Sequence, residues 1–295
     1  MAVNDHRVFV VVSRMGYHNS WAGQVGRAIR QCFETFGFPA WLVCTNSLPK
    51  TAENDLLVYL VNKLPPSHVG TPGHKVYWNF HPCVPERAHG YSGYYHKHWV
   101  ETEKSLRRGH FCAVLEYDKV QYQFMERAKW PVWHCPVGYH KSFEVAPSEP
   151  LPRGIYFLGN LSTKRRHWID IVGAKTVNYT TTPWVQNRLL CTPGVHINVK
   201  LRTMGCFLGL RVIMLLASNA RCIVTENSGW SPLKRGKHCF EATKPEKMKR
   251  ICADLMRHPE ECEKIGRQGY EFVKTHLRLE ASLVPVIREV LGVTL

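Results

Sequence analysis

The stretch His6-Arg-Val-Phe-Val-Val-Val-Ser13 opens the sequence with an apolar run that ends on a polar residue. Helical spacing follows over Gln24 to Phe36, where apolar residues recur every three or four positions until the pattern stops at Gly37. A second apolar run, Phe38 to Cys44, completes a strand–loop–helix–strand unit. Such a unit predicts a parallel sheet, because the helix returns the chain to the edge where the first strand began.

Further apolar runs extend this pattern along the first half of the chain. Strands are expected at 56–61, 75–80 and 111–116, and a short edge strand at 131–136. The segment 82–108 is rich in His, Tyr, Gly and Pro. We expect it to form a long loop of the kind that carries active sites, followed by a helix near 100–106.

A second start of the same kind follows a proline-rich segment. Ala146-Pro-Ser-Glu-Pro-Leu-Pro152 holds three prolines in seven residues and is expected to link two domains. The strand run Gly154-Ile-Tyr-Phe-Leu-Gly159 comes directly after it. Later strands are expected at 176–179, 196–199 and 222–226, and helices at 209–217, 245–256, 259–275 and 281–291. The sequence therefore predicts an α/β protein with two halves, 1–147 and 148–276, and a final helix over 277–295.

The composition agrees with a globular chain of two domains. The 295 residues are 44% hydrophobic and 21% charged. No apolar run has the length of a transmembrane helix, and the stretch from Met1 to His6 lacks the layout of a signal peptide. The 11 cysteines are scattered without a CxxC pair, which is typical of reduced thiols and argues against a zinc ribbon. A cytoplasmic location is therefore expected.

The charge balance points to a polyanionic partner. Lys and Arg number 39 against 23 Asp and Glu, which gives a formal net charge of +16. Such an excess favours nucleic acid, an anionic membrane surface or a phosphate-rich ligand. The alternative is a basic protein that is merely soluble.

Arg211 and Glu226 form the strongest candidate constellation. One helix leads into one strand between them, and a right-handed βαβ unit can place both at the same edge of a sheet. A carboxylate at a strand end can bind two ribose hydroxyls, and an arginine can neutralise a diphosphate. The alternative is a structural ion pair.

Polar residues beside this pair extend the candidate site. Asn198 and Lys200 follow the expected strand at 196–199 and could supply a hydroxyl contact and a cation, or be ordinary surface residues. The segment Asn227-Ser228-Gly229 follows Glu226, and its backbone amides could cradle a phosphate.

The first strand of the second half carries a further set of candidates. Gly159 and Asn160 follow it as a phosphate-loop candidate, with Lys164 and Arg165 as cations or as a solvated face. Trp184 could stack on a nucleobase or pack in the core. All of these residues are expected to surround one nucleotide-like ligand.

These residues resemble the second half of GT-B glycosyltransferases. The resemblance covers about 130–276 and is carried by Pro136-Val-Gly-Tyr139, Ile155-Tyr-Phe-Leu-Gly159 with Lys164-Arg165-Arg166, His196-Ile-Asn-Val199, Arg211, Ile223-Val-Thr-Glu226, Gly236-Lys-His-Cys-Phe240 and Ile265-Gly-Arg-Gln-Gly269. The pattern is similar to the group that contains spore-maturation CgeB-like transferases and phage DNA glycosyltransferases.

The resemblance implies two Rossmann-like domains facing across a cleft. It implies an acceptor-binding domain over 1–147, a domain over 148–276 that binds a nucleotide-sugar, expected to be a UDP-sugar, and a C-terminal helix that crosses back to the first domain. It implies no obligatory metal, and a monomer is expected.

Retaining members often carry two glutamates eight residues apart in the donor loop, whereas Lys234 stands eight residues after Glu226. Inversion of the sugar linkage is therefore favoured, with Glu226 as a ribose anchor.

Inversion needs a general base in the first half to deprotonate an acceptor hydroxyl. The candidates are Asp118 and Glu116, which follow the strand run 111–115, His81, which follows the strand at 75–80, and His18 in the first loop. Each could instead cap a helix or lie in a solvated loop.

Basic and aromatic residues are interleaved between residues 78 and 108 and suit a nucleic-acid backbone with an extruded base. The candidates for this contact are Tyr94, Tyr95, Lys97, His98, Trp99, Arg107 and Arg108. The expected acceptor is a 5-hydroxymethylpyrimidine in DNA, as in phage-type DNA modification, and the location would then be the host cytoplasm. A glycan, lipid-linked sugar or protein acceptor is the alternative, and a non-catalytic nucleic-acid-binding protein is the alternative of another class.

Overall fold

The computed structural model describes residues 5–13, 21–60, 65–79, 93–145, 149–177, 188–200, 209–218, 221–227 and 231–293. The chain divides into two compact units. The first unit is Met1–Val137 together with Leu279–Leu295, and the second unit is Gly138–Arg278. This division falls before the proline-rich segment that the sequence marked as the linker, and it assigns the last helix to the first unit.

The first unit is a six-stranded, fully parallel sheet with the order β2-β1-β3-β4-β5-β6. Its strands are β1 (Val8–Val12), β2 (Ala40–Cys44), β3 (Leu56–Tyr59), β4 (His74–Asn79), β5 (Ala113–Glu116) and β6 (Val132–His134). Its helices are α2 (Trp21–Thr35), η2 (Pro66–His68), α3 (Gly93–Arg107), α4 (Lys119–Arg127) and α10 (Leu279–Leu291). The short strand β6 lies at the sheet edge, as its sequence predicted.

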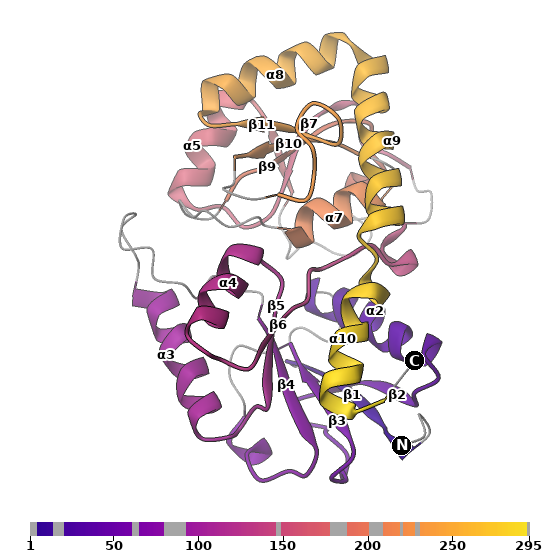
Figure 1. Ribbon diagram of the computed structural model, residues 1–295. Coiled ribbons are helices and arrows are strands. Elements are labelled where there is room, and N and C mark those ends of the chain that lie inside the picture. Colours follow the sequence, from indigo (N-terminus) through magenta and orange to yellow (C-terminus); the bar gives the residue numbers. More distant parts are fainter. Residues whose placement is uncertain are drawn as a thin grey trace. The chain divides into compact units, whose positions relative to one another are not determined.

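Helices cover both faces of this sheet, with α2 and α10 on one side and α3 and α4 on the other (Figure 1). The strands carry apolar residues on both faces because both are buried. Phe9, Leu57 and Met125 are among the residues of one packed cluster under α3 and α4. Burial of each such side chain stabilises the fold by about 1.5–3 kcal/mol.

The second unit is a five-stranded parallel sheet with the order β11-β10-β9-β7-β8. Its strands are β7 (Gly154–Leu158), β8 (Lys175–Val177), β9 (Gly194–Asn198), β10 (Cys222–Glu226) and β11 (Phe240–Ala242). Its helices are η3 (Lys141–Phe143), α5 (Thr163–Val172), α7 (Gly209–Ala217), α8 (Pro245–Arg257) and α9 (Pro259–His276). Helices α5 and α8 pack together, as do α7 and α9 (Figure 1).

Local sequence signals fix several helix ends. Ser162 begins α5 by accepting a hydrogen bond from the Arg165 amide, and Gly173 ends it in the left-handed conformation. Asp118 begins α4 by accepting from the amides of Val120 and Gln121. Because each cap satisfies amides that a helix start leaves without partners, it is worth about 1 kcal/mol.

Two elements differ from the expectations. Helix α3 begins at Gly93, well before the expected start near residue 100, because no proline or glycine interrupts the chain after Gly93. The strand β11 was not expected, since its three residues follow a turn at Gly236 and are too few to show alternation. Among the helices of the described residues, none combines the length and the apolar character that crossing a bilayer requires.

Candidate functional site at the strand ends of the second unit

The candidate site lies where the strand order of the second sheet reverses. From β7 the chain moves to β8 on one side, and then β9 pairs with β7 on the other side. In open parallel sheets, ligands bind beyond the carboxyl ends of the strands at such a reversal. The carboxyl ends of β7, β9 and β10 are therefore the candidate ligand site.

Glu226 ends β10 and is held by two other segments. Its Oε1 accepts from Lys164 Nζ at 2.6 Å, and its Oε2 accepts from the backbone N–H of Lys200 at 3.0 Å. The Glu226 residue is 9% exposed, so the carboxylate lies just inside the surface. Lys164 comes from the start of α5 and Lys200 from the end of β9. The structure thus joins three of the predicted donor residues around one carboxylate.

Arg211 lies at the neighbouring strand end. Its guanidinium Nη1 donates to Asn198 Oδ1 at 2.8 Å, and Asn198 Nδ2 donates to Thr225 Oγ1 at 3.0 Å. The guanidinium also packs over the Phe157 ring at 5.2 Å from its centroid. Arg211 and Glu226 therefore lie at the same edge, as predicted, but Arg211 reaches the strand ends through Asn198.

Gly159 lets the arginine approach the end of β7. Its φ of 149° is a conformation that favours glycine, and a Cβ built there would lie 2.9 Å from Arg211 Nη2. A side chain at this position would displace the guanidinium. The loop after β7 is thus shaped for close contact between backbone and arginine.

Arg165 contacts the backbone, whereas the neighbouring Lys164 contacts the Glu226 carboxylate. It is buried, and its guanidinium donates to the carbonyls of Val199 at 2.9 Å and Asn160 at 2.8 Å. These bonds fix the loop after β7 against the end of β9. Arg165 therefore positions the site, whereas the sequence suggested a cation for phosphate.

Glu241 and Arg235, which sequence reasoning missed, form an ion pair beside the predicted residue Asn227. Glu241 in β11 accepts from Asn227 Nδ2 at 2.9 Å and from Arg235 Nη2 at 2.7 Å. Lys200 Nζ donates to the Asn227 carbonyl at 2.6 Å. A carboxylate inside an apolar run, as in Phe240-Glu-Ala242, is the signal that could have identified Glu241.

The strand ends of the first unit hold a different arrangement. Glu116 ends β5 and is fully buried, with its Oε2 accepting from Asn79 Nδ2 at 2.6 Å and its Oε1 from the Asp118 amide at 2.9 Å. Burial raises the pKa of Glu116 well above its ordinary value, and the nearby Asp118 carboxylate adds to this. Asp118 is itself buried, and its Oδ1 caps α4.

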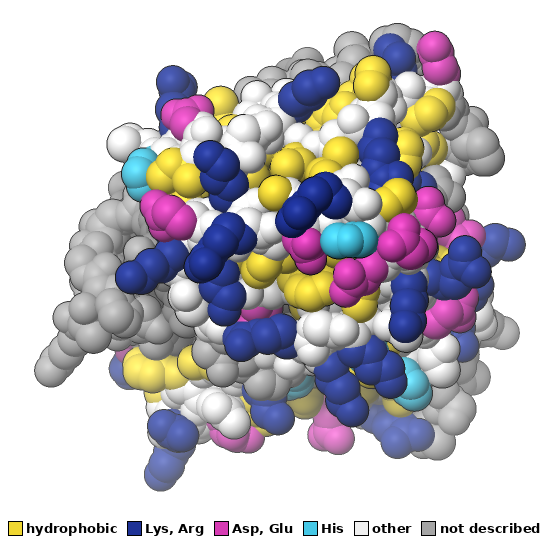
Figure 2. Space-filling view, turned by 90° about the horizontal axis from the view of Figure 1, so that it is seen from above, with side chains coloured by type: hydrophobic (Ala, Val, Ile, Leu, Met, Phe, Trp, Pro, Cys, Tyr) yellow, Lys and Arg dark blue, Asp and Glu magenta, His cyan; other side chains and the backbone are white. Residues whose placement is uncertain are grey.

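Several predicted site residues lie outside the described part of the chain, namely His18, His81, Trp184, Ser228 and Gly229. The side chains at the start of α3 are also not described, and this part of the helix carries the predicted residues Tyr94, Tyr95, Lys97, His98 and Trp99. Arg107 and Arg108 are exposed, and Arg107 pairs with Glu103 at 2.7 Å. On the face viewed in Figure 2, Lys and Arg side chains alternate with acidic and apolar ones.

One group of possible metal ligands lies near the turn between α8 and α9. Ligand atoms of Asp254, His258 and Glu261 lie within 4.8 Å of one another, and all three residues are exposed. Asp254 already accepts from Arg257 at 3.1 Å. This group is remote in the fold from the strand ends around Glu226, because α8 runs away from the carboxyl edge of the sheet.

No protein-family model and no curated protein matches this sequence. Solved structures share its fold. Anabaena HepE, solved with UDP and glucose, has a TM-score of 0.66 and 8% identity over 97% of this chain and 100% of HepE. Sucrose-phosphate synthase of Thermosynechococcus elongatus has a TM-score of 0.63 and 10% identity over 95% of this chain and 97% of that one.

S. aureus TarM has a TM-score of 0.58 and 13% identity over 80% of this chain. The match covers 55% of TarM, so this chain spans about half of its length. At these identities the comparisons establish the fold. The chain has the two Rossmann-like α/β units of GT-B glycosyltransferases, as the sequence predicted.

Proposed function

We propose that this protein is a glycosyltransferase that transfers a sugar from a nucleotide-sugar, expected to be a UDP-sugar, to a hydroxyl acceptor. The observation that carries the proposal is the position of Glu226. It is a near-buried carboxylate at the end of β10, held by Lys164 and by the Lys200 amide beside the reversal of strand order. The ligands named for the structural neighbours, UDP and UDP-glucose, support the same class of donor.

The proposed donor site assigns each polar group a task. Glu226 accepts hydrogen bonds from the ribose hydroxyls, while Lys164 and the Lys200 amide keep the carboxylate oriented. The diphosphate lies against the loop of Gly159, next to Arg211 and near the backbone that follows Glu226. These cations and amides stabilise the leaving nucleotide without a metal ion.

The acceptor that we propose is a 5-hydroxymethylpyrimidine base in DNA. The net charge of +16 and the resemblance to phage DNA glycosyltransferases support it. The aromatic and basic residues of α3, from Tyr94 to Arg107, and the following Arg108 are the proposed DNA contact. A glycan, lipid-linked sugar or protein acceptor is the second candidate, since the basic side chains in Figure 2 do not form one continuous patch.

We propose that transfer proceeds with inversion and that the general base lies in the first unit. A base must reach the acceptor hydroxyl. Because Glu116 and Asp118 are fully buried and engaged with backbone amides, His81 and His18 are the favoured candidates for direct contact. The two carboxyl groups then hold the end of β5 and the start of α4 in place.

The decisive experiment combines the chain with duplex DNA containing 5-hydroxymethylcytosine and a panel of UDP-sugars. Mass spectrometry of the DNA and measurement of released UDP report transfer and donor turnover separately. The Glu226→Ala variant is expected to lose UDP release, whereas Glu246→Ala, an exposed glutamate at the start of α8, is expected to keep it.

The outcomes separate the candidates. Slow UDP release without modified DNA supports a transferase with another acceptor. Salt-sensitive DNA binding in a gel shift, without any nucleotide binding, supports the non-catalytic nucleic-acid-binding protein. Absence of both nucleotide binding and UDP release contradicts the proposed transferase.

A further inference from the structure

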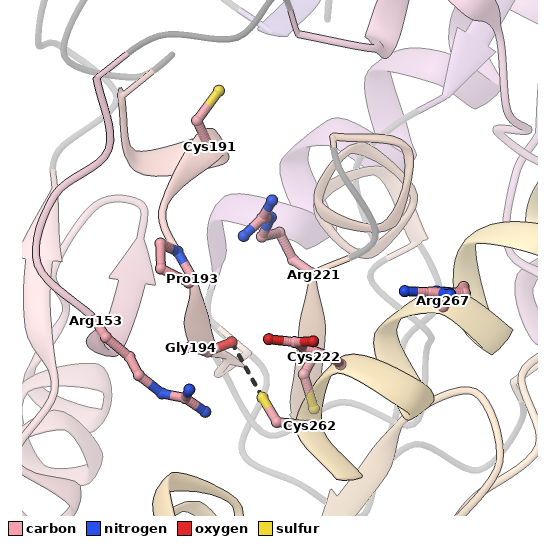
Figure 3. Close-up of a pocket in the computed structure, with 9 residues that line it drawn as sticks. Arg153, Cys191, Pro193, Gly194, Arg221, Cys222, Cys262 and Arg267 are labelled. Atoms are coloured by element: carbon pink, nitrogen blue, oxygen red, sulfur yellow. Dashed lines mark hydrogen bonds between the residues drawn. The ribbon is translucent and has the colours of Figure 1, made fainter. Parts of the chain in front are cut away.

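A cavity of about 380 Å³ opens at the opposite edge of the second sheet (Figure 3). Gly194 and Cys222, the first residues of β9 and β10, line it, and Arg153 precedes β7. It therefore lies at the amino ends of the strands, away from the strand ends around Glu226. Its size falls within the range of about 300–1,000 Å³ that small-molecule sites occupy.

The cavity concentrates positive charge. Three arginines line it, Arg153, Arg221 and Arg267, against one carboxylate, Glu263. Within the described residues, none of the three guanidiniums forms an ion pair. The lining therefore has an excess of two positive charges that no carboxylate of the described chain neutralises.

Arg221 is the fixed part of this lining. Its Nε donates to the Ser218 carbonyl at 3.1 Å and its Nη1 to the Thr192 carbonyl at 2.9 Å. The residue is half-buried, and burial lowers the pKa of its guanidinium. Two carbonyl groups orient a guanidinium but do not cancel its charge. A half-buried cation that forms no ion pair among the described residues favours binding of an anion.

A close approach of two strands forms one wall of the cavity. Gly194 has a φ of 122°, and a Cβ built there would lie 2.2 Å from the Gly154 carbonyl oxygen. Only glycine allows β9 to begin this close to β7. The neighbouring wall is formed by Cys262, whose Sγ donates to the Gly194 carbonyl at 3.5 Å (Figure 3).

We propose that this cavity is a second ligand site, for a small molecule that carries two anionic groups of phosphate or carboxylate type. Guanidinium groups bind both kinds of anion through paired N–H groups, and three arginines around one cavity can hold two of them. Glu263 at the rim can accept a hydroxyl or ammonium group of the same ligand. The small volume excludes a polymer such as nucleic acid from the cavity itself.

The test is calorimetric titration of the full chain with pyrophosphate and, separately, with succinate. We expect saturable binding of at least one of them. Arg267 is exposed and forms no ion pair among the described residues, so Arg267→Gln should leave the fold intact and weaken binding about tenfold. Arg250→Gln, an exposed arginine on α8, is the matched control and should leave the affinity unchanged.

A second readout locates the bound anion. Cys191 lies at the cavity and is partly exposed, so a bound anion should slow its alkylation by iodoacetamide, as measured by mass spectrometry. Pyrophosphate can also bind at the site around Glu226, where we place the diphosphate next to Arg211, and Arg211→Gln separates that site from this cavity. Binding of pyrophosphate alone identifies phosphate groups, and binding of succinate alone identifies carboxylates.

Three results would overturn the proposal. One is that neither anion binds at millimolar concentration. Another is that the affinity falls in Arg211→Gln and stays unchanged in Arg267→Gln. The last is that the alkylation rate of Cys191 is the same with and without a saturating anion.

Discussion

Two of the described strands end on a glutamate, and the two glutamates have opposite surroundings. Glu226 ends β10 beside the ammonium group of Lys164, whereas Glu116 ends β5 among neutral donors and next to the Asp118 carboxylate. One carboxylate has a counter-charge near the surface, and the other is fully buried and forms no ion pair with any described residue. The same sequence feature thus produces an ion pair in one unit and a carboxyl group that favours its proton in the other.

The difference comes from distant segments of the chain. Lys164 lies 62 residues before Glu226, and Asn79 lies 37 residues before Glu116. A lysine neutralises a carboxylate, whereas an asparagine only donates a hydrogen bond, which does not offset the loss of solvent around a buried charge. A strand that ends on a glutamate is therefore not enough to identify a ligand site.

The largest expected effect is on the pH dependence of stability through Glu116. Its raised pKa means that the folded chain keeps a proton that the unfolded chain loses above its ordinary pKa near 4.5. The free energy of unfolding should therefore fall as pH rises through this window, by up to about 1.4 kcal/mol per pH unit. Urea unfolding of the wild type and of Glu116→Gln, between about pH 5 and pH 8, measures the difference in slope.

The two proteins are compared by how steeply the free energy of unfolding changes with pH, because Glu116→Gln also changes hydrogen bonding and so shifts the stability at every pH. Both oxygens of Glu116 accept hydrogen bonds, so the NH₂ group that Glu116→Gln introduces would face a donor at one of these two positions. This mismatch costs about 1–3 kcal/mol at every pH. Equal slopes in the two proteins would show that Glu116 is ionised in the fold and would remove the contrast with Glu226.

The next effect is on nucleotide affinity, and it compares the two glutamates directly. Glu226→Gln keeps the shape of the side chain but removes the charge that Lys164 faces and that we propose ribose hydroxyls contact. The affinity for UDP should fall about thirtyfold, equivalent to about 2 kcal/mol. Glu116→Gln should leave the affinity unchanged, as measured by calorimetry. Similar losses in the two variants would contradict the assignment of the donor site to the second unit.

A smaller effect is expected for the partner of Glu226. Lys164→Gln removes one contact with the carboxylate, but the Lys200 amide still holds the other oxygen. The affinity for UDP should fall about fivefold, with a stability change below about 1 kcal/mol because the ion pair is partly exposed. Lys249→Gln, an exposed lysine on α8, is the matched control. A loss larger than that of Glu226→Gln would indicate that Lys164 contacts the nucleotide itself.

The sequence was sufficient for the fold and for the sheet edge at which Glu226, Lys164 and Lys200 come together. Strand-like runs and helical spacing predicted two parallel sheets, and the strand at 222–226 was placed with its last residue correct. These features depend on local periodicity, which each segment carries by itself. The three-residue strand β11 was missed because so short a segment carries no periodicity.

The partners within the site could not be predicted. Lys164 and Arg165 are adjacent and both looked like phosphate-binding cations. About 100° of helix rotation separates consecutive residues, so one side chain meets Glu226 while the other enters the protein and binds the Val199 carbonyl. Which neighbour a side chain meets depends on the packing of α5 against the sheet, and the sequence of α5 alone does not contain this information.

The smallest effect is expected at Asp118, where two substitutions distinguish a role as the cap of α4 from a role as the general base. Asp118→Ala removes the cap of α4 and should lower stability by about 1 kcal/mol, whereas Asp118→Asn should retain it because asparagine caps helices equally well. Asparagine cannot accept a proton as a base does. If Asp118 only begins α4, sugar transfer by Asp118→Asn should stay within about threefold of the wild type, and a loss of about 100-fold or more at unchanged stability would instead make it the base. In that case the buried carboxyl groups of the first unit, and not its histidines, would perform the chemistry that complements Glu226.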